Sequence, residues 1–273
     1  IVIVDESLQP HIDELRSYRG IKVFVTSVEH IRRLRRYPLN TAHKFLLLSE
    51  KDNINFELAS FLLERYPELG PRIVYHVSDL RFLRVMRDTR VVQQCITFNQ
   101  YELAATQLAR EWLIKRFNAT EHRDTVVLAG FGRFGQSILE QLELHASDAF
   151  SRVAIIDLKA EQRALIADEQ IATERKYSRH TYEGDIDDPE IWQRLLKEVV
   201  VGEEEPVFVI TTGDDHTNLR CAIWLRQKFE NALIISRTLA PSYFAKGVCA
   251  EHDVVSVNTA ELVQASIPHA WYR

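Results

Sequence analysis

The sequence predicts an α/β fold made of two tandem domains. Each is expected to be a doubly wound parallel sheet, the first lacking its first strand and its glycine loop. Short apolar runs alternate with helical runs along the chain, which is typical of a parallel sheet with helices on both faces. A glycine-rich turn joins a strand to a helix near the middle of the chain. Segments of the first half also recur, in the same order, in the second half.

The first third of the chain alternates strands and helices. Apolar runs such as IVIV at residues 1–4 and FLLL at residues 45–48 predict buried strands. Residues 55–66 carry apolar side chains at helical spacing. The predicted strands are residues 1–4, 21–25, 45–48, 73–77 and 91–98, and the predicted helices are residues 10–18, 28–36, 55–66 and 100–117.

Composition places the chain among ordinary globular proteins. Its 273 residues, 46% hydrophobic and 27% charged, suffice for one large or two ordinary domains. A net charge of −5 gives no reason to expect nucleic acid as a partner. No run of 18 apolar residues predicts a membrane span. The chain opens inside a predicted strand and not on Met, so we expect a fragment of a longer protein.

Cysteine and histidine spacing points to no disulfide framework and no metal centre. Cys95, Cys221 and Cys249 are widely spaced and form no CxxC pair, so we expect reduced thiols in a cytosolic protein. Cys221 lies in an apolar helical run and is predicted to be part of the core. The ten histidines show no HxxxH or HExxH pattern, and no metal site is predicted.

The glycine turn follows the strand predicted at residues 125–129 and precedes a helix predicted at residues 136–144. Its sequence, GFGRFG, has the spacing of the dinucleotide fingerprint of Rossmann-like domains. Gly130 is expected to allow the tight turn, Gly132 the close approach of a pyrophosphate, and Gly135 the packing of helix on sheet. The helix N-terminus would then direct free N–H groups and its dipole at phosphates. The alternative is a glycine turn that binds nothing.

Asp157 ends the next predicted strand, residues 153–156. A carboxylate there can accept hydrogen bonds from ribose hydroxyls and repels a 2′-phosphate, which favours NAD or AMP, ADP or ATP over NADP. After a helix at residues 160–171, Gly184 and Asp185 reach the carboxyl edge of the sheet. Asp185 could meet the adenine amino group, or could cap the helix that begins near residue 188.

The remaining elements cross the predicted switch point of the sheet. Residues 207–210 form the fourth strand of the second copy, and the polar loop 211–215 follows at its carboxyl end, where it could line a nicotinamide or phosphate group. Alternatively, Asp215 only caps the helix at residues 218–228. Arg237, after the strand at residues 233–236, could reach a phosphate or be an ordinary surface arginine. A sixth strand is predicted at residues 254–257 and a last helix at residues 261–267.

Four pairs of segments carry the internal repeat. Residues 1–5 resemble 153–157, and 45–55 resemble 208–218. In the same order, residues 73–77 resemble 233–237, and 99–103 resemble 258–262. We therefore expect two copies of one fold, in domains 1–118 and 119–273, with the first strand and glycine loop of the first copy lying before residue 1. The alternative is two generic α/β units without kinship.

The second copy resembles the RCK domain, also called KTN or TrkA-N. The matching segments are VVLAGFGRFGQ (126–136), AIIDLK (154–159), YEGDIDDPE (182–190), ITTGDDHTNL (210–219) and IISRTL (234–239). The glycine segment is especially similar to that of Kef-type potassium efflux systems, and tandem copies are familiar from channel gating rings and Trk subunits. The resemblance extends more loosely over residues 1–109. Gly213 departs from the bulkier polar residue that is usual there, and no C-terminal RCK subdomain is evident after Ile267.

The resemblance implies a function in binding and not in catalysis. The chain would be a cytosolic regulatory pair at the cytoplasmic face of the cell membrane. It would bind NAD(H) or an adenine nucleotide, act on a membrane-embedded potassium channel or transporter, and assemble as a homo-oligomer. The implied nucleotide-binding residues are Gly130, Phe131, Gly132, Arg133, Phe134, Gly135, Asp157, Leu158, Lys159, Gly184, Asp185, Ile186, Thr211, Thr212, Gly213 and Arg237.

Two other functions remain open at this point. An NAD-dependent oxidoreductase would need a substrate domain and a catalytic base, for which His216 is the best candidate in the sequence. Both halves of the chain instead resemble the binding fold. A scaffold that binds no nucleotide is the third alternative, and it is more plausible for the first copy than for the second.

The first prediction concerns the ribose acid. Asp157→Arg should abolish binding of NAD or AMP and leave the fold intact, because the substitution reverses the charge that the ribose hydroxyls meet. Calorimetric titration measures the affinity. An unchanged affinity would mean that Asp157 does not hold the ribose.

Overall fold

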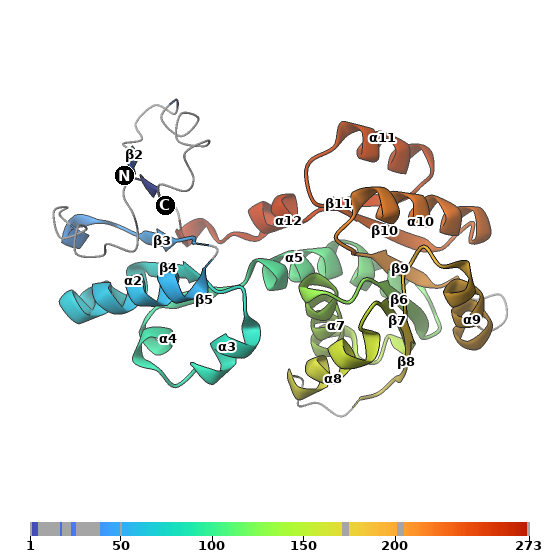
Figure 1. Ribbon diagram of the computed structural model, residues 1–273, viewed down its shortest axis with the longest axis horizontal. Coiled ribbons are helices and arrows are strands. Elements are labelled where there is room, and N and C mark those ends of the chain that lie inside the picture. The colour runs from blue at the N-terminus through green and yellow to red at the C-terminus, as the bar shows by residue number, and fades with distance from the viewer. Residues whose placement is uncertain are drawn as a thin grey trace. The chain divides into compact units, whose positions relative to one another are not determined.

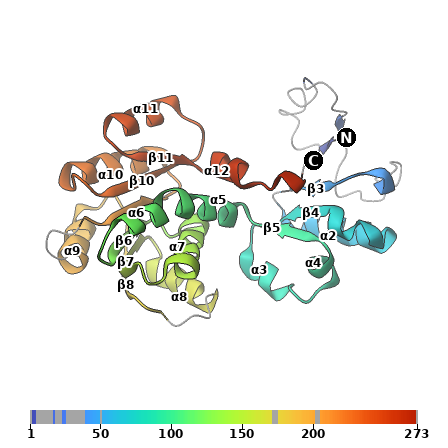
Figure 2. The same ribbon diagram turned by 180° about the vertical axis from the view of Figure 1, so that it is seen from behind.

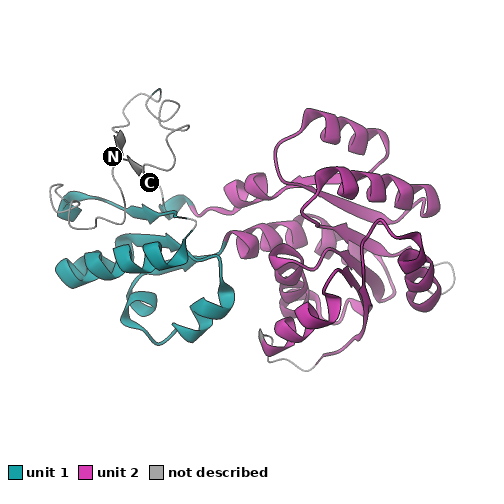
Figure 3. Cartoon of the chain, in the orientation of Figure 1, with its two compact units in different colours: residues 1–99, 269–273 teal, residues 100–268 magenta. Residues whose placement is uncertain are grey.

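The computed structural model describes residues 2–4, 17, 23–25, 39–49, 51–170, 175–200 and 205–271. They belong to two compact units (Figure 3). One unit comprises Ile1–Asn99 together with His269–Arg273, and the other comprises Gln100–Pro268. Apart from Ser17, the helices predicted at residues 10–18 and 28–36 lie outside the described residues.

The second unit contains a six-stranded parallel sheet in the order β11-β10-β9-β6-β7-β8. The strands are β6 Asp124–Ala129, β7 Phe150–Asp157, β8 Ser178–Glu183, β9 Val207–Ile210, β10 Leu233–Thr238 and β11 Val255–Asn258. The chain runs outward from β6 to β8, returns to the other side of β6, and runs outward again to β11. This is the doubly wound arrangement that the sequence predicts, with its switch point between β6 and β9.

Helices cover both faces of this sheet (Figures 1 and 2). They are α5 Gln100–Leu108, α6 Ile114–Ala119, α7 Arg133–Ala146, α8 Ala160–Gln170, α9 Pro189–Val199, α10 Asp215–Lys228, α11 Tyr243–Glu251 and α12 Thr259–Ser266. A π-helical stretch, Ala109–Leu113, joins α5 to α6. The sequence analysis predicts one helix over residues 100–117, which agrees, and misses α11.

Alternation along the strands creates two separate cores. In β6, Val126 and Leu128 face one core, together with apolar side chains of α5, α7, α8 and α12. Val127 and Ala129 face the other, together with side chains of α9, α10 and α11. Successive side chains of a strand point to opposite faces, so a strand buried on both faces is apolar throughout. The run TVVLA therefore identifies β6 as a central strand.

The first unit has smaller sheets. Its strands are β1 Val2–Val4, β2 Val23–Val25, β3 Phe45–Leu47, β4 Ile73–His76 and β5 Ile96–Phe98. Its helices include α2 Asp52–Arg65, α3 Leu80–Val85 and α4 Arg90–Gln94, with 3₁₀ turns at Leu39–Thr41, Pro67–Arg72 and His269–Trp271. The strand predicted at residues 91–98 is wrong in its first half. That segment forms α4, and only its last three residues pair with β4, because Val91 packs into the core from a helix instead of a strand.

Strand pairing in the first unit matches that of the second. In each, three strands pair in sequence order, β3-β4-β5 and β9-β10-β11, and two others pair as β1-β2 and β7-β8. In the second unit β6 lies between β7 and β9. Among the described residues of the first unit, no strand joins β1 to β3. Within the described residues, this pairing agrees with the prediction that the first copy lacks its first strand.

The repeat extends to individual hydrogen bonds. Asn218 accepts from Thr212 N at 3.1 Å and donates to the carbonyl oxygens of Thr212 and Arg237. Asn55, its counterpart in the first copy, accepts from Ser49 N at 3.0 Å and donates to the carbonyl oxygens of Ser49 and His76. Both asparagines are fully buried.

A pair of aspartates repeats in the same way. Asp52 accepts from Ser78 N at 2.8 Å, and Asp215 accepts from Leu239 N at 2.8 Å. Each carboxylate thus holds the chain just beyond the middle strand of its three-stranded group. Two copies of one fold explain these shared contacts better than two unrelated α/β units do.

The boundary between the two compact units differs from the boundary that the sequence repeat predicts. Helix α5 packs with α7 and α12, so it belongs to the second compact unit. The repeat assigns the same helix to the first copy, since residues 99–103 resemble 258–262. The boundary between domains 1–118 and 119–273 stays a prediction. No helix among the described residues is long and apolar enough to span a bilayer.

The buried asparagines lead to a stability prediction. Asn218→Ala removes partners from three part-buried backbone groups and should lower the free energy of unfolding by roughly 2 kcal/mol. Urea denaturation of the whole chain measures the change. Asn231→Ala is the matched control, because Asn231 is exposed on the loop before β10 and should change stability little. Equal stability of the two variants would contradict the structural role of Asn218.

Candidate functional site

The glycine loop leaves β6 at the switch point and enters α7. Gly130 has a φ of 92°, a conformation that favours glycine, and a Cβ there would lie 2.7 Å from Thr212 N. A Cβ on Gly135 would lie 2.4 Å from the carbonyl oxygen of Gly130. The first glycine therefore permits the turn and the last permits close packing of α7, as the fingerprint requires.

Gly132 differs from these two because it faces open space. A Cβ at this position would have one neighbour within 4 Å, Arg163 Nη1 at 3.8 Å. Gly132 is also the N-cap of α7, and no side chain caps the first turn. The first N–H groups of a helix lack intrahelical partners and attract anions. This arrangement leaves a cradle of backbone donors that a phosphate fits.

Asp157 is buried at the carboxyl end of β7 and holds the loop in place. Its Oδ2 accepts from Phe131 N at 2.8 Å, and its Oδ1 accepts from Lys159 N at 2.9 Å. Arg163 Nη1 also donates to Oδ2 at 2.5 Å. The carboxylate therefore orients both the glycine loop and the arginine beside Gly132. Asp157→Arg would remove all three contacts and place a cation beside Arg163, so it would disturb the glycine loop itself and not leave the fold intact as expected above. A substitution at Gly132 therefore tests nucleotide binding more cleanly.

The strand beyond the switch point packs directly against the turn. Thr211 N donates to the carbonyl oxygen of Ala129 at 2.7 Å, and Thr211 Oγ1 donates to that of Gly130 at 2.7 Å. Thr212 is held by Asn218, as described above. Gly213 follows, exposed, with nothing within 4 Å of a Cβ placed there. The polar loop 211–213 thus lies against the start of the glycine loop.

The N-cap of α10 is not Asp215, which the sequence analysis gave as an alternative. Asp214 caps α10 by accepting from Thr217 N at 2.6 Å, and this hydrogen bond lowers the pKa of the Asp214 carboxyl. Asp215 instead holds the chain beyond β10. The proposed cap role of Asp215 is therefore wrong by one residue.

Two arginines flank the loop. Arg237 is half-buried, with its guanidinium 5.3 Å from the ring centroid of Phe134 and its Nε donating to Thr259 Oγ1 at 3.0 Å. Burial lowers the pKa of Arg237, which marks a cation partly removed from water and not an ordinary surface arginine. Arg133 is exposed and lies 5.1 Å over the ring of Tyr101.

The third strand brings Gly184, Asp185 and Ile186 to the same edge of the sheet. Gly184 N donates to the carbonyl oxygen of Asp157 at 3.1 Å. The N-cap of α9 is Asp188, which accepts from Glu190 N at 2.9 Å, so the alternative that Asp185 caps this helix is wrong. Asp185 is exposed, its Oδ1 accepts from Asp187 N at 3.0 Å, and its carbonyl oxygen accepts from Asp188 N at 3.1 Å. Ile186 is buried, and its carbonyl oxygen accepts from Trp192.

The predicted residues thus gather around the carboxyl ends of β6, β7, β8, β9 and β10, where ligands of doubly wound sheets bind. Leu158 and Lys159 are exposed beyond Asp157. Two residues of the site were missed. Arg163 lies on the first turns of α8, six residues after the acid, and an i+6 spacing carries no recognised signal. Asn218 appears in the repeat, which could have marked it as structural.

The comparisons agree with this architecture. Residues 126–257 match the TrkA-N domain family. The second unit is a Rossmann-type fold, because its fingerprint loop lies at the switch point of a doubly wound sheet. The match lies wholly within this unit and supports the assignment of the second copy to the RCK/TrkA-N family that its sequence resembles. A search of curated proteins finds no matching sequence.

Several solved structures share the fold over nearly the whole chain. The GsuK channel bound to NAD has a TM-score of 0.63 and 12% identity, over 96% of this chain and 57% of that one. The GsuK structure bound to ADP has a TM-score of 0.61 and 15% identity, over 96% and 60%. The GsuK RCK domain has a TM-score of 0.59 and 11% identity, over 96% of this chain and 69% of that one. At these identities the likeness is one of fold. The chain spans about 60% of the length of the channel chains.

Alanine substitutions should destabilise the chain at a glycine that is tightly packed and have little effect at a glycine that faces open space. Gly130→Ala should destabilise the chain by roughly 2 kcal/mol, because its φ is strained for alanine and the Cβ meets the backbone of Thr212. Gly213→Ala, in open space, should change stability by less than about 0.5 kcal/mol. Thermal unfolding of both variants measures this. Equal melting temperatures would contradict the close approach at the switch point.

Proposed function

We propose that this chain is a cytosolic pair of regulatory domains of a potassium channel or transporter, which binds NAD(H) or an adenine nucleotide to control ion flux. The single observation that carries the proposal is the glycine loop at the switch point, open at Gly132 and held by Asp157. The family and the likeness to a channel solved with NAD and with ADP support it.

The residues present fit a nucleotide. The free N–H groups at the start of α7 would receive the phosphates over Gly132, where the one group within 4 Å of an added Cβ is the Arg163 guanidinium, itself a phosphate partner. Arg163 and Arg237 supply positive charge on either side of the loop, and Arg133 is exposed on the first turn of the same helix. A bound nucleotide supplies negatively charged phosphate, one group in AMP, two in ADP and NAD(H) and three in ATP, and NAD(H) also carries a redox state that the domain can distinguish.

Ribose and adenine would lie toward β7 and β8. Asp157 would accept from the ribose hydroxyls and share its Oδ2 with Arg163. Its charge disfavours a 2′-phosphate, so NAD and AMP, ADP or ATP are preferred over NADP. Gly184 and Asp185 follow on the neighbouring strand, where the exposed carboxylate can accept from the adenine amino group.

Regulation would follow from linkage. A ligand shifts a two-state assembly only by the difference of its affinities for the two states. The glycine loop, the loop 211–213 and the end of β10 share contacts, so binding would order them together. The partners are the membrane-embedded part of the channel or transporter and further copies of this chain, assembled at the cytoplasmic face of the membrane.

An oxidoreductase is a weaker candidate. His216, the best base in the sequence, is exposed at the start of α10 and makes no hydrogen bond found in the described residues. Neither compact unit resembles a separate substrate domain, because both repeat the binding fold. We therefore infer that the chain is not an enzyme.

Calorimetric titration of the chain with NAD, NADH, AMP, ADP and ATP tests the proposal. At least one should bind, and Gly132→Asp should abolish that binding, because the added carboxylate occupies the phosphate cradle. Gly247→Asp is the matched control, since it adds the same charge in open space on α11 and not on the glycine loop. Both variants should have the melting temperature of the unmodified chain.

Arg163→Ala refines this test. The guanidinium lies beside Gly132, so its loss should lower the affinity for ADP by roughly tenfold and leave the affinity for adenosine, which has no phosphate, unchanged. Binding by none of the nucleotides would instead favour a scaffold that binds no nucleotide. Equal binding by the Gly132→Asp chain would place the nucleotide elsewhere.

A further inference from the structure

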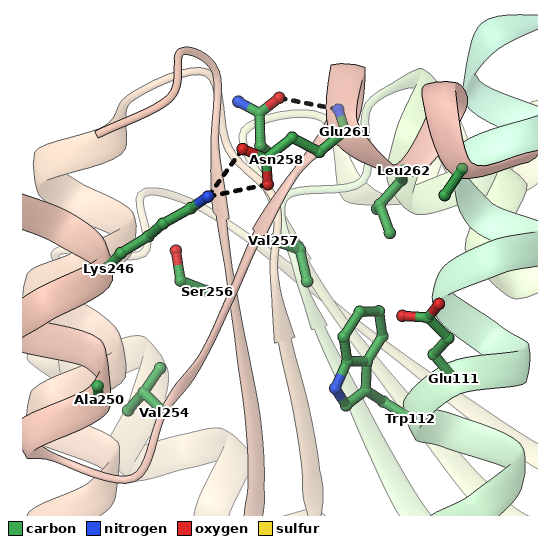
Figure 4. Close-up of a pocket in the computed structure, with 11 residues that line it drawn as sticks. Glu111, Trp112, Lys246, Ala250, Val254, Ser256, Val257, Asn258, Glu261 and Leu262 are labelled. Atoms are coloured by element: carbon green, nitrogen blue, oxygen red, sulfur yellow. Dashed lines mark hydrogen bonds and ion pairs between the residues drawn. The ribbon is translucent and has the colours of Figure 1, made fainter. Parts of the chain in front are cut away.

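The second unit holds a pocket of about 400 Å³ away from the glycine loop. It lies between α11, β11, α12 and the π-helical stretch Ala109–Leu113. Pockets of this size are typical of small-molecule sites. Its floor is apolar, formed by Val254, Val257 and Leu262, all of which are buried (Figure 4).

The π-helical stretch supplies the wall that gives the pocket its chemistry. Glu111 and Trp112 both come from this segment and both line the pocket, opposite α11 (Figure 4). Such stretches are rare and occur frequently at functional sites, because they interrupt regular α-helical hydrogen bonding. The indole of Trp112 is half-buried and packs against the core.

The charges around the pocket do not balance. Lys246 is engaged by Glu261, with Nζ at 2.7 and 3.0 Å from the two carboxylate oxygens, as the dashed lines in Figure 4 mark. Glu111 forms no ion pair with Lys246, the cation among the lining residues, because Lys246 pairs with Glu261. Its Oε1 accepts from Gln107 Nε2, and the nearby Arg110 donates to Gln107 Oε1 instead of to Glu111. One carboxylate therefore faces the pocket without a paired cation.

We propose that this pocket binds a small organic cation, an amine carried on an apolar or aromatic body. The apolar floor would take the body of the ligand. Glu111 would pair with the ammonium group, and the face of Trp112 would add a cation–π contact. An anion is disfavoured, because Lys246 is already neutralised by Glu261 and Glu111 would repel it.

This site is separate from the proposed nucleotide site. Its residues lie on α11, β11, α12 and the π-helical stretch, whereas the glycine loop and Asp157 belong to β6, α7 and β7. Two carboxylates at the pocket also oppose a phosphate. Binding of an amine here requires no nucleotide, so the two proposals can fail independently.

Three probes with the same aromatic body test the proposal: 2-phenylethylamine, 2-phenylethanol and 3-phenylpropanoate. Calorimetric titration of the unmodified chain should give the order amine, alcohol, carboxylate, from tightest to weakest. Glu111→Gln should lower the affinity for the amine by roughly tenfold, to about the affinity for the alcohol, since one charge-assisted hydrogen bond is lost. Glu121→Gln is the control, because Glu121 is exposed in the loop before β6 and should change nothing.

Lys246→Met provides a second test that does not depend on how Glu111→Gln folds. Removal of the ammonium frees the Glu261 carboxylate, so the amine should bind more tightly and the carboxylate probe more weakly. Equal affinities for the three probes, tightest binding of the carboxylate, or no binding of the amine would each overturn the proposal.

Discussion

The close approach of two chain segments at the switch point governs this structure. The turn at Gly130 brings its backbone against Thr211 and Thr212, and the last glycine of the loop lets α7 pack on that turn. Neither contact tolerates a Cβ. Because β6 and β9 are neighbours there, the loops that follow them share one edge of the sheet, and the candidate phosphate cradle opens beside them. A side chain at either glycine would displace the cradle and the loop together.

Buried polar groups hold this edge in both copies. Asn218 and Asn55 each hydrogen-bond three backbone groups at the carboxyl ends of neighbouring strands, and Asp215 and Asp52 each hold the chain beyond the next strand. A buried backbone group without a partner is costly, so such side chains are hard to replace one at a time. The same bonds at corresponding positions argue for duplication more strongly than apolar patterns do, since any α/β unit has apolar strands.

The two candidate ligand sites differ in the charge they present. At the glycine loop, helix N–H groups, Arg163 and Arg237 surround an open space, which suits phosphates. In the pocket between α11 and α12, carboxylates exceed the one ammonium, and an indole lines the wall, which suits a cation. Arg237 contacts Thr259, the first residue of α12, and Asn258 lines the pocket immediately before it. The strand β11 therefore ends between the two sites.

The sequence by itself determined the doubly wound sheet, the glycine loop, the position of Asp157 at the end of a strand and the repeat, because apolar runs between helical runs and the spacing of glycines are local patterns. It also implied the missing first strand, with which the separate pairing of β1-β2 and β3-β4-β5 among the described residues agrees. Tertiary structure alone decided which aspartates act as caps, the helix at Arg90–Gln94, and the place of Arg163 beside Gly132. It alone also brought Glu111 and Lys246 to one pocket. Those features depend on contacts between residues far apart in the chain, or on which face of an element meets the core, and a single sequence does not encode them as a pattern.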